Sequence, residues 1–200
     1  MIEEQKGHGL KKLNLVILNA LLFLSPCSFA FKIPVKPTVI YDEDNRKDFN
    51  EISEEKAFDG KRSVLAIIYN ENLNTLKNGE VHIDGKTLGS ERQLCANEAF
   101  AKQLAVADCS AFLIAPNIAV TAGHCMNTVA DCKKKKFVQN YAVTPSQDMQ
   151  GAFFVYTENT ATCTEIIARE KNPATGLDYA VLKLDRELES NHYFKMRTEG

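Results

Sequence analysis

From Ser63 onward, apolar residues occur in short runs that are separated by Asn, Asp, Gly and Pro. The runs are rich in β-branched and aromatic residues, which is the pattern of β-strands bounded by turns. The predicted strands cover residues 63–69, 81–83, 111–115, 118–121, 137–143, 152–156, 163–169 and 179–184. Residues 96–105 are compatible with a helical turn. Many short strands with frequent turns predict an all-β sandwich or barrel.

The first 62 residues follow a different pattern. Three lysines precede the apolar run 13–24. The small residues Ser28 and Ala30 lie three and one positions before the bond between residues 30 and 31, as at a signal-peptide cleavage site. These are features of a secretory signal peptide, so we predict that residues 1–30 are removed by cleavage after Ala30. Residues 31–62 are polar and charged, which indicates a pro-segment or N-terminal extension.

A chain with such a signal is expected to be secreted or periplasmic, without stable membrane association. The apolar run is short for a membrane span, so an uncleaved N-terminal anchor is the weaker alternative. Lipid attachment at Cys27 is weaker still, because Pro26 directly precedes that cysteine. Export would permit disulfides to form and persist.

Composition narrows the class of protein. A hydrophobic content of 44% and a charged content of 25% are ordinary for a globular chain and exclude wholesale disorder. Lys and Arg number 24 against 26 Asp and Glu, a near-neutral balance that argues against a nucleic-acid-binding protein. We expect a monomer. The lysine run at 133–136 is expected to be a solvated loop rather than a binding patch.

The segment from Cys109 to Cys125 is predicted to form a β-hairpin with its turn centred on Asn117. Opposed residues in such a hairpin have position numbers with a constant sum, here 234, and Cys109 and Cys125 have that sum. Opposed Cα atoms lie about 4.5–5.5 Å apart, which is within the range of a disulfide. We therefore predict a disulfide between these two cysteines.

His124 lies at the end of the second strand of this hairpin, next to the predicted disulfide and after the small residues Ala122 and Gly123. A catalytic imidazole needs such rigid anchoring, because its orientation decides whether it can act as a base. A structural histidine beside a disulfide would occupy the same place. From these residues alone the two interpretations are equally well supported.

The hairpin sequence resembles the histidine motif of the trypsin/chymotrypsin-like serine proteases. Residues 110–114 (SAFLI) and 119–125 (AVTAGHC) match that family's strand of small residues followed by T-A-[AG]-H-C. Ala111 stands where the family usually has Gly, a difference of one methyl group. More narrowly, residues 39–46 and 92–95 resemble secreted bacterial members of the family.

The family's second motif is an Asp that opens an apolar strand, and residues 178–184 (DYAVLKL) resemble it. Asp178 follows His124 by 178 − 124 = 54 positions, which suits the family's order and spacing. The resemblance implies that His124 is the catalytic base and that Asp178 is the buried acid that orients it, with a Ser as nucleophile.

The resemblance also implies the fold and the substrate. The fold would be a trypsin-like double Greek-key β-barrel, with the first barrel over residues 63–184 and an inter-barrel linker over residues 185–200. The reaction would be hydrolysis of polypeptide substrates by a serine endopeptidase, with no cofactor and no metal.

The family's nucleophilic serine lies in a G-D-S-G-G or G-N-S-G-S loop after the Asp. The only serine after Asp178 is Ser190, which has no flanking glycine and lies in a charged loop. Residues 63–200 number 138, fewer than the roughly 200–250 of a two-barrel domain. We therefore expect an incomplete protease that is inactive alone, with its Ser beyond residue 200. The alternative is a non-catalytic secreted homologue that acts as a binding or decoy module.

Cleavage of the predicted signal peptide would leave five cysteines, an odd number. With Cys109 and Cys125 paired, Cys132 and Cys163 are the favoured second pair. The rival interpretation is a zinc site formed by His124 with Cys125, Cys132 and Cys163. Its spacing lacks the close pairs of ligands that are typical of structural zinc sites.

Overall fold

The structure is a computed structural model that describes residues 45–52, 62–95, 97–142, 153–188, 193–195 and 197–199. The chain divides into two compact units, Met1–Asn45 and Arg46–Gly200, and the second is described below. The predicted signal peptide, its cleavage site and most of the predicted extension lie outside the described residues, as does Ser190. No helix within the described ranges combines the length and apolar character that crossing a bilayer requires.

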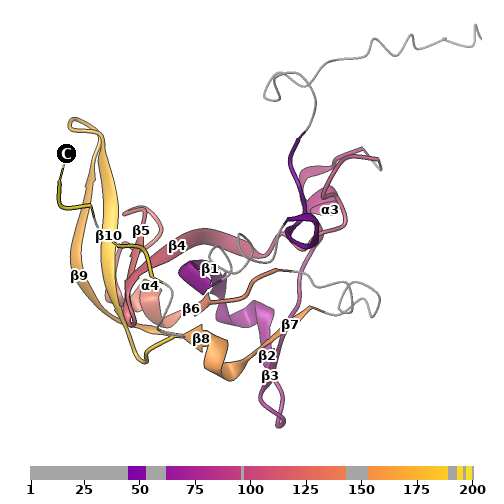
Figure 1. The fold of residues 1–200 in the computed structure, drawn as a ribbon, viewed down its shortest axis with the longest axis horizontal. Coiled ribbons are helices and arrows are strands. Elements are labelled where there is room, and N and C mark those ends of the chain that lie inside the picture. The colour runs from indigo at the N-terminus through magenta and orange to yellow at the C-terminus, as the bar shows by residue number, and fades with distance from the viewer. Residues whose placement is uncertain are drawn as a thin grey trace, which may run out of the picture. The chain divides into compact units, whose positions relative to one another are not determined.

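The regular secondary structure of the described residues is mostly β-strand, which confirms the predicted all-β class (Figure 1). The strands are β1 (Val64–Tyr69), β2 (Leu73–Thr75), β3 (Glu80–Ile83), β4 (Ala107–Ala115), β5 (Ile118–Thr121), β6 (Lys135–Val138), β7 (Phe154–Tyr156), β8 (Thr160–Ala161), β9 (Cys163–Asn172) and β10 (Leu177–Leu184). The helices are short: the 3-10 turns η1 (Phe49–Glu51), η2 (Asn70–Asn72) and η3 (Thr157–Asn159), and the α-helices α3 (Leu88–Arg92) and α4 (Val129–Lys133).

Within the described residues the strands form two sheets. The larger has seven antiparallel strands in the order β8-β6-β1-β4-β5-β10-β9, and the smaller has three in the order β2-β3-β7. Figure 1 shows the larger sheet curling so that β9 and β10 stand up on one side of β4 and β5. This curled sheet agrees with the predicted trypsin-like barrel architecture. It also places β5 and β10, the strands that precede His124 and contain Asp178, next to each other.

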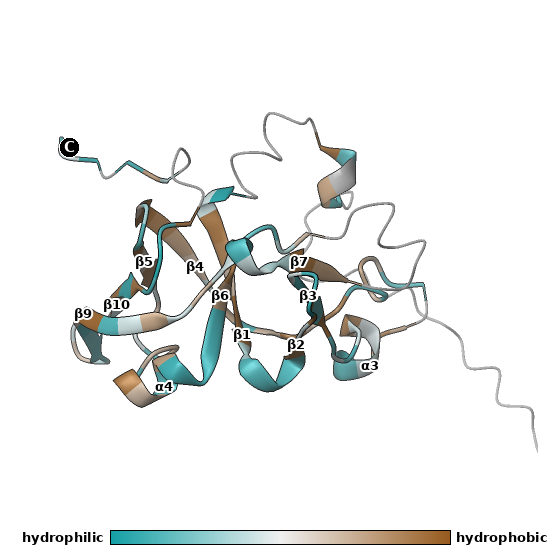
Figure 2. Cartoon of the chain, turned by 90° about the horizontal axis from the view of Figure 1, so that it is seen from below, coloured by the Kyte–Doolittle hydropathy of each residue, from teal (hydrophilic) through white to brown (hydrophobic). Residues whose placement is uncertain are grey.

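Strand β1 lies between two hydrophobic clusters. Leu65 and Ile67 face the cluster inside the curl of the large sheet, whereas Ala66 and Ile68 face a second cluster with β3 and β7. All four side chains are buried, and burial of a Leu or Ile side chain stabilises the fold by about 1.5–3 kcal/mol. Figure 2 shows hydrophobic residues along β4 and β5.

Two expected elements differ from the structure by more than an extension of their ends. Strand β6 begins at Lys135 and ends at Val138, instead of covering 137–143, because Asn140 has a left-handed backbone with φ of 61° and turns the chain. The predicted helical turn at 96–105 is wrong for the described residues there, which form non-helical turns. The helix lies earlier, at α3, where the side chain of Thr87 accepts a hydrogen bond from the N–H of Ser90 and caps it.

The prediction of a solvated loop for the lysine run is wrong for Lys135 and Lys136, although Lys133 and Lys134 are exposed. Lys133 ends α4 and Lys134 follows it, but Lys135 and Lys136 belong to β6. Lys135 is only 5% exposed, because its ammonium group finds acceptors inside the fold. The capping box of Thr128 and Asp131, which starts α4, was the sequence signal for a helix here.

Candidate active site

The hairpin of β4 and β5 forms as predicted, but in a different register. Ala111 is opposite Thr121 and Phe112 is opposite Val120, so opposed positions sum to 232 rather than 234. Next to the turn, Ala115 is opposite Ile118, so the sum there is already 233, and an irregularity between Leu113 and Ala115 lowers it by one more. Cys125 therefore lies beyond the end of β5, in a turn.

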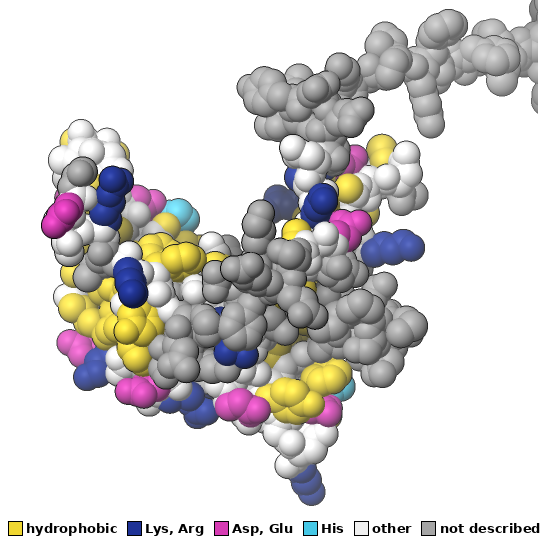
Figure 3. Space-filling model, in the orientation of Figure 1, with side chains coloured by type: hydrophobic (Ala, Val, Ile, Leu, Met, Phe, Trp, Pro, Cys, Tyr) yellow, Lys and Arg dark blue, Asp and Glu magenta, His cyan; other side chains and the backbone are white. Residues whose placement is uncertain are grey.

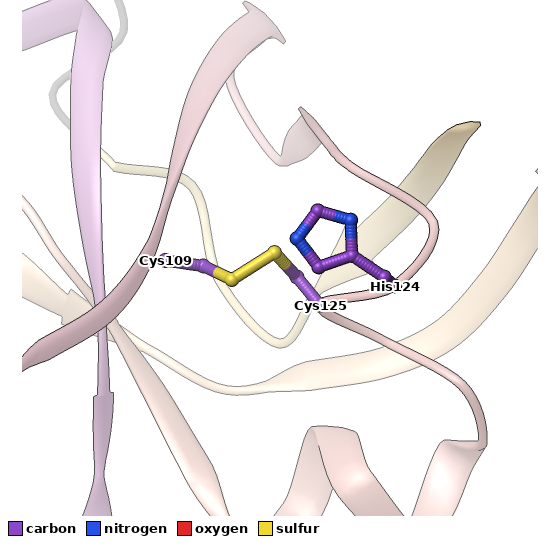
Figure 4. Close-up of side chains that lie close together, drawn as sticks. All are labelled: Cys109, His124 and Cys125. Carbon is purple, nitrogen blue, oxygen red and sulfur yellow. A yellow bond between two sulfur atoms is a disulfide. The ribbon is translucent and has the colours of Figure 1, made fainter. Parts of the chain in front are cut away.

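That turn brings Cys125 back to Cys109, and the structure joins the two residues in a disulfide. Their sulfur atoms lie 1.98 Å apart and their Cα atoms 6.2 Å apart, farther than the spacing expected for directly opposed residues. Figure 4 shows the imidazole ring of His124 beside this bond. The disulfide thus links the start of β4 to residues 122–128, which contain His124 and are called the histidine turn below.

A glycine allows the turn to approach the neighbouring strands closely. A Cβ atom on Gly123 would lie 2.4 Å from the carbonyl oxygen of Glu170 and 2.9 Å from that of Tyr179. Both contacts are to backbone atoms of β9 and β10, which cannot move without disturbing the sheet. The missing side chain therefore lets the histidine turn lie directly against the strand that contains Asp178.

Asp178 holds His124 at two points. Its Oδ1 accepts a hydrogen bond of 2.9 Å from the backbone N–H of His124, and its Oδ2 lies 2.6 Å from the ring Nδ1. The pairing of β10 with β5 explains this placement, since Ala180 is opposite Thr121 and Asp178 is two residues before Ala180. Two residues separated by 54 positions are thus in direct contact.

The family model described as Trypsin matches residues 89–197, a range that includes the hairpin, the histidine turn and β10. The chain belongs to the trypsin family. Members of this family act as peptidases on polypeptide substrates, so the family membership indicates peptidase chemistry. No curated protein matches this trypsin-family chain.

The contact with Asp178 determines which ring nitrogen of His124 is a donor. An ionised carboxylate only accepts hydrogen bonds, so Nδ1 must carry a proton to bind it. In the neutral ring this leaves Nε2 with a free lone pair. The side chains of His124 and Asp178 are 54% and 38% exposed, so the aspartate of this trypsin-family chain is not buried by the described residues.

The hydrogen bond from the His124 ring lowers the pKa of the Asp178 carboxyl below its ordinary value. Desolvation opposes this change, whereas the backbone N–H of His124 and the positive charges of His124 and Lys171 add to it. The carboxylate form is therefore favoured in the folded chain.

This lowered pKa predicts that the His124–Asp178 contact persists into acid. For a carboxyl whose pKa is lower in the folded state, the stabilisation is fully present above the unfolded pKa and is lost as pH falls through the folded pKa. An NMR titration of the Asp178 carboxyl carbon should give a midpoint below that of an unperturbed aspartate. In the variant His124→Ala the midpoint should move back up, and an unchanged midpoint would contradict the assignment of the shift to His124.

The cysteines of the rival zinc site are joined in two disulfides. Cys132 and Cys163 are joined to each other, with sulfurs 2.19 Å apart, and Cys125 is joined to Cys109. Sγ atoms in disulfides are not thiolates, the form that binds zinc. The same reasoning applies to the cluster of Cys109, His124 and Cys125, whose potential ligand atoms lie within 4.8 Å of one another.

Two further described residues of the same types, His82 and Cys95, have other surroundings. His82 contacts Glu80 at 3.1 Å and stacks on the ring of Phe154 in the smaller sheet. Cys95 is an exposed free cysteine among the described residues. His192 and Ser190 lie outside the described residues.

Hydrophobic side chains are exposed on one face of the trypsin-family sheet. Figure 3 shows them gathered over β4 and β5. Phe112 of β4 is 39% exposed and Phe194 is 47% exposed, and their rings meet edge to face with centroids 5.9 Å apart. The backbone N–H of Phe194 donates to the carbonyl of Leu113, which attaches this late segment to β4.

Two residues with contacts to the histidine turn were missed by sequence reasoning. Arg169 of β9 binds carbonyl oxygens of the turn, and Lys135 of β6 binds another. Arg169 lies in a predicted strand and Lys135 in a predicted loop, and neither belongs to a family motif. For Lys135, the sequence offered one local feature, a run of four lysines directly after Cys132.

Proposed function

We propose that this chain supplies the general base, His124, and its orienting carboxylate, Asp178, for hydrolysis of peptide bonds by a serine nucleophile. The observation that carries the proposal is the two-point contact of Asp178 with the ring and the backbone of His124. A surface ion pair needs only one such contact, whereas two contacts fix both the position and the tautomer of the ring. Membership of the trypsin family supports the same roles.

In this proposal the proton moves along a defined path. Nε2 of His124 takes the proton of the serine hydroxyl as the serine oxygen attacks the carbonyl carbon of the substrate. The imidazolium that forms is stabilised by the carboxylate of Asp178, which stays ionised. His124 then gives the proton to the leaving amine, so the base is regenerated after water has hydrolysed the acyl-enzyme.

We place the nucleophile outside residues 1–200. No serine of this sequence is directly followed by glycine, as the family's nucleophile loop requires. Ser110 belongs to β4, and its carbonyl oxygen accepts a hydrogen bond of 2.7 Å from the hydroxyl of Thr121. The 200-residue chain is therefore expected to have no peptidase activity alone.

We further propose that the protein is exported. Disulfides form and persist in oxidising compartments and are rare in the cytosol, and the structure contains two of them. The sequence of residues 1–30 supports the same route, as an export signal that ends at Ala30.

Labelling by a fluorophosphonate probe, which reacts with activated serines, tests the proposal. Two proteins would be expressed: the 200-residue chain, and a longer product that includes any residues encoded after Gly200. We expect labelling of the longer product on a serine after residue 200, and none of the 200-residue chain. His124→Ala should abolish labelling, whereas the control His82→Ala should retain it, because His82 contacts Glu80 and Phe154 instead.

Two outcomes would contradict the proposal. Labelling of the 200-residue chain would show that its nucleophile is already present. A folded longer product that is not labelled, and that has no glycine-flanked serine, would favour the non-catalytic binding homologue.

A further inference from the structure

The turn that holds His124 has little regular structure of its own. It leaves β5 after Thr121 and reaches α4 at Val129. Within it, one backbone hydrogen bond of 3.0 Å joins the N–H of Cys125 to the carbonyl of Ala122. Buried carbonyl groups of such a turn need partners from elsewhere in the fold.

Arg169, on strand β9, supplies partners on one side. Its Nε donates to the carbonyl oxygens of Gly123 at 2.9 Å and Met126 at 2.8 Å. Its Nη2 donates to Oδ1 of Asn127 at 2.6 Å, and the amide of Asn127 in turn donates to the carbonyl of His124 at 3.3 Å. A single guanidinium thus binds the turn at Gly123, directly before the histidine, and again at Met126 and Asn127 after it.

Lys135, on strand β6, supplies a partner from another direction. Its Nζ donates to the carbonyl oxygen of Cys125 at 3.2 Å and to Oδ2 of Asp108 at 2.5 Å. It also lies 4.6 Å from the centroid of the Tyr69 ring, a distance at which a cation is attracted to the ring.

The ammonium group of Lys135 stays charged in this buried place. Burial disfavours the charged form, but the hydrogen bond to Asp108 and the negative charge of Asp108 outweigh it and raise the pKa of Lys135 above its ordinary value. A cation is therefore present inside the fold, and one of its hydrogen bonds goes to the carbonyl oxygen of Cys125, the residue after His124. A lysine in a solvated loop, by contrast, would keep its ammonium group in water.

We propose that Arg169 and Lys135 are positioning residues, two cations that bind backbone carbonyls on both sides of His124 and thereby hold its ring against Asp178. This inference rests on the proposed function of His124 and Asp178. Catalytic groups must be held within about 0.5 Å of their productive geometry, and the residues that hold them need fixed positions themselves. Strands β6 and β9 provide such positions, since both belong to the large sheet.

The chain offers a matched control for each cation. Lys136 is the next residue of β6, is half-buried, and donates to the hydroxyl of Thr162 at 2.7 Å instead of to the turn. Arg186 donates to the carbonyl of Thr157 at 3.3 Å, also away from the turn. Lys136→Met and Arg186→Gln remove the same charges without touching the site.

The first test observes the ring proton itself. In the 200-residue chain, the Nδ1 proton of His124, shared with the Asp178 carboxylate, should give a strongly deshielded signal in proton NMR. We expect Arg169→Gln and Lys135→Met to weaken or abolish this signal, and both control variants to keep it. Arg169→Lys, which keeps the charge but loses the planar group, should give an intermediate signal, because a lysine can still reach a carbonyl.

The second test uses the longer product defined above. A displacement of the ring by about 1 Å costs on the order of 100-fold in rate, so kcat should fall by about that factor in Arg169→Gln with KM unchanged. The control Arg186→Gln should keep the parent kcat.

The outcomes separate this inference from the proposed function. A variant that melts at a lower temperature but keeps the full ring-proton signal and the full kcat would overturn the positioning role, because the residue would then be only structural. If Lys135→Met does not fold, the two variants of Arg169, Arg169→Gln and Arg169→Lys, decide the inference. Absence of the ring-proton signal in the parent chain, or absence of probe labelling in the parent longer product, would instead overturn the proposed function.

Discussion

Replacement of Asp178 by asparagine is expected to lower kcat of the longer product by about 10⁴-fold. The asparagine side chain would keep the shape of the aspartate but could donate its amide N–H to Nδ1 of His124, which would then act as the acceptor. The ring would carry its proton on Nε2, the atom that must take the proton of the serine. The measurement is the rate of hydrolysis of a chromogenic peptide substrate at saturation.

The matched control is Asp185→Asn. Asp185 accepts a hydrogen bond of 2.9 Å from the backbone N–H of Thr162 and has no contact with the histidine turn. Its variant should keep the parent kcat. A loss of less than tenfold in Asp178→Asn would mean that Asp178 does not orient the base, and the proposed roles would have to be withdrawn.

Removal of the second disulfide is expected to cost about 4 kcal/mol in the free energy of unfolding. Cys132 and Cys163 are 0% and 1% exposed, and the bond between them closes a loop with a sequence separation of 31. A cross-link over such a loop restricts the unfolded chain, which gives about 4 kcal/mol in the chain-entropy model. Urea unfolding of the double variant Cys132→Ser/Cys163→Ser measures the loss.

Cys95→Ser is the control for this experiment. Cys95 is exposed and free, so its replacement should change the free energy of unfolding by no more than about 0.5 kcal/mol. If the double variant were as stable as this control, the pairing would not contribute to stability. Because Cys132 lies in α4, directly after the histidine turn, the double variant should also weaken the ring-proton signal of His124.

Short-range patterns in the sequence predicted much of the fold. The apolar runs at 63–69, 118–121 and 179–184 correspond to β1, β5 and β10, because strand formation and turn residues act over a few positions. The resemblance to the trypsin family, carried by two motifs, agrees with the family match over 89–197. The two cysteine pairs expected from the sequence are the pairs joined in the structure.

Properties that depend on contacts between distant segments were not predictable in the same way. The hairpin register was wrong by two in the sum of positions, because neither the position of the turn between Ala115 and Ile118 nor the irregularity between Leu113 and Ala115 could be read from the sequence pattern. The strand at β6 ended early, because the left-handed conformation of Asn140 overrode an apolar run. The first error concerns how two segments pair, and the second concerns where one strand ends.

The sequence alone determined that His124 follows a strand beside a disulfide and that Asp178 opens an apolar strand, since both statements depend on neighbours in the chain. Only the tertiary structure decided that Asp178 holds His124 at two points, because that contact depends on the pairing of β5 with β10. It also showed that Lys135, which belongs to a run expected to be solvated, is a buried cation that contacts the histidine turn. A lysine is buried where folding supplies a carboxylate and a carbonyl for its charge, and here those partners come from positions 27 and 10 residues away.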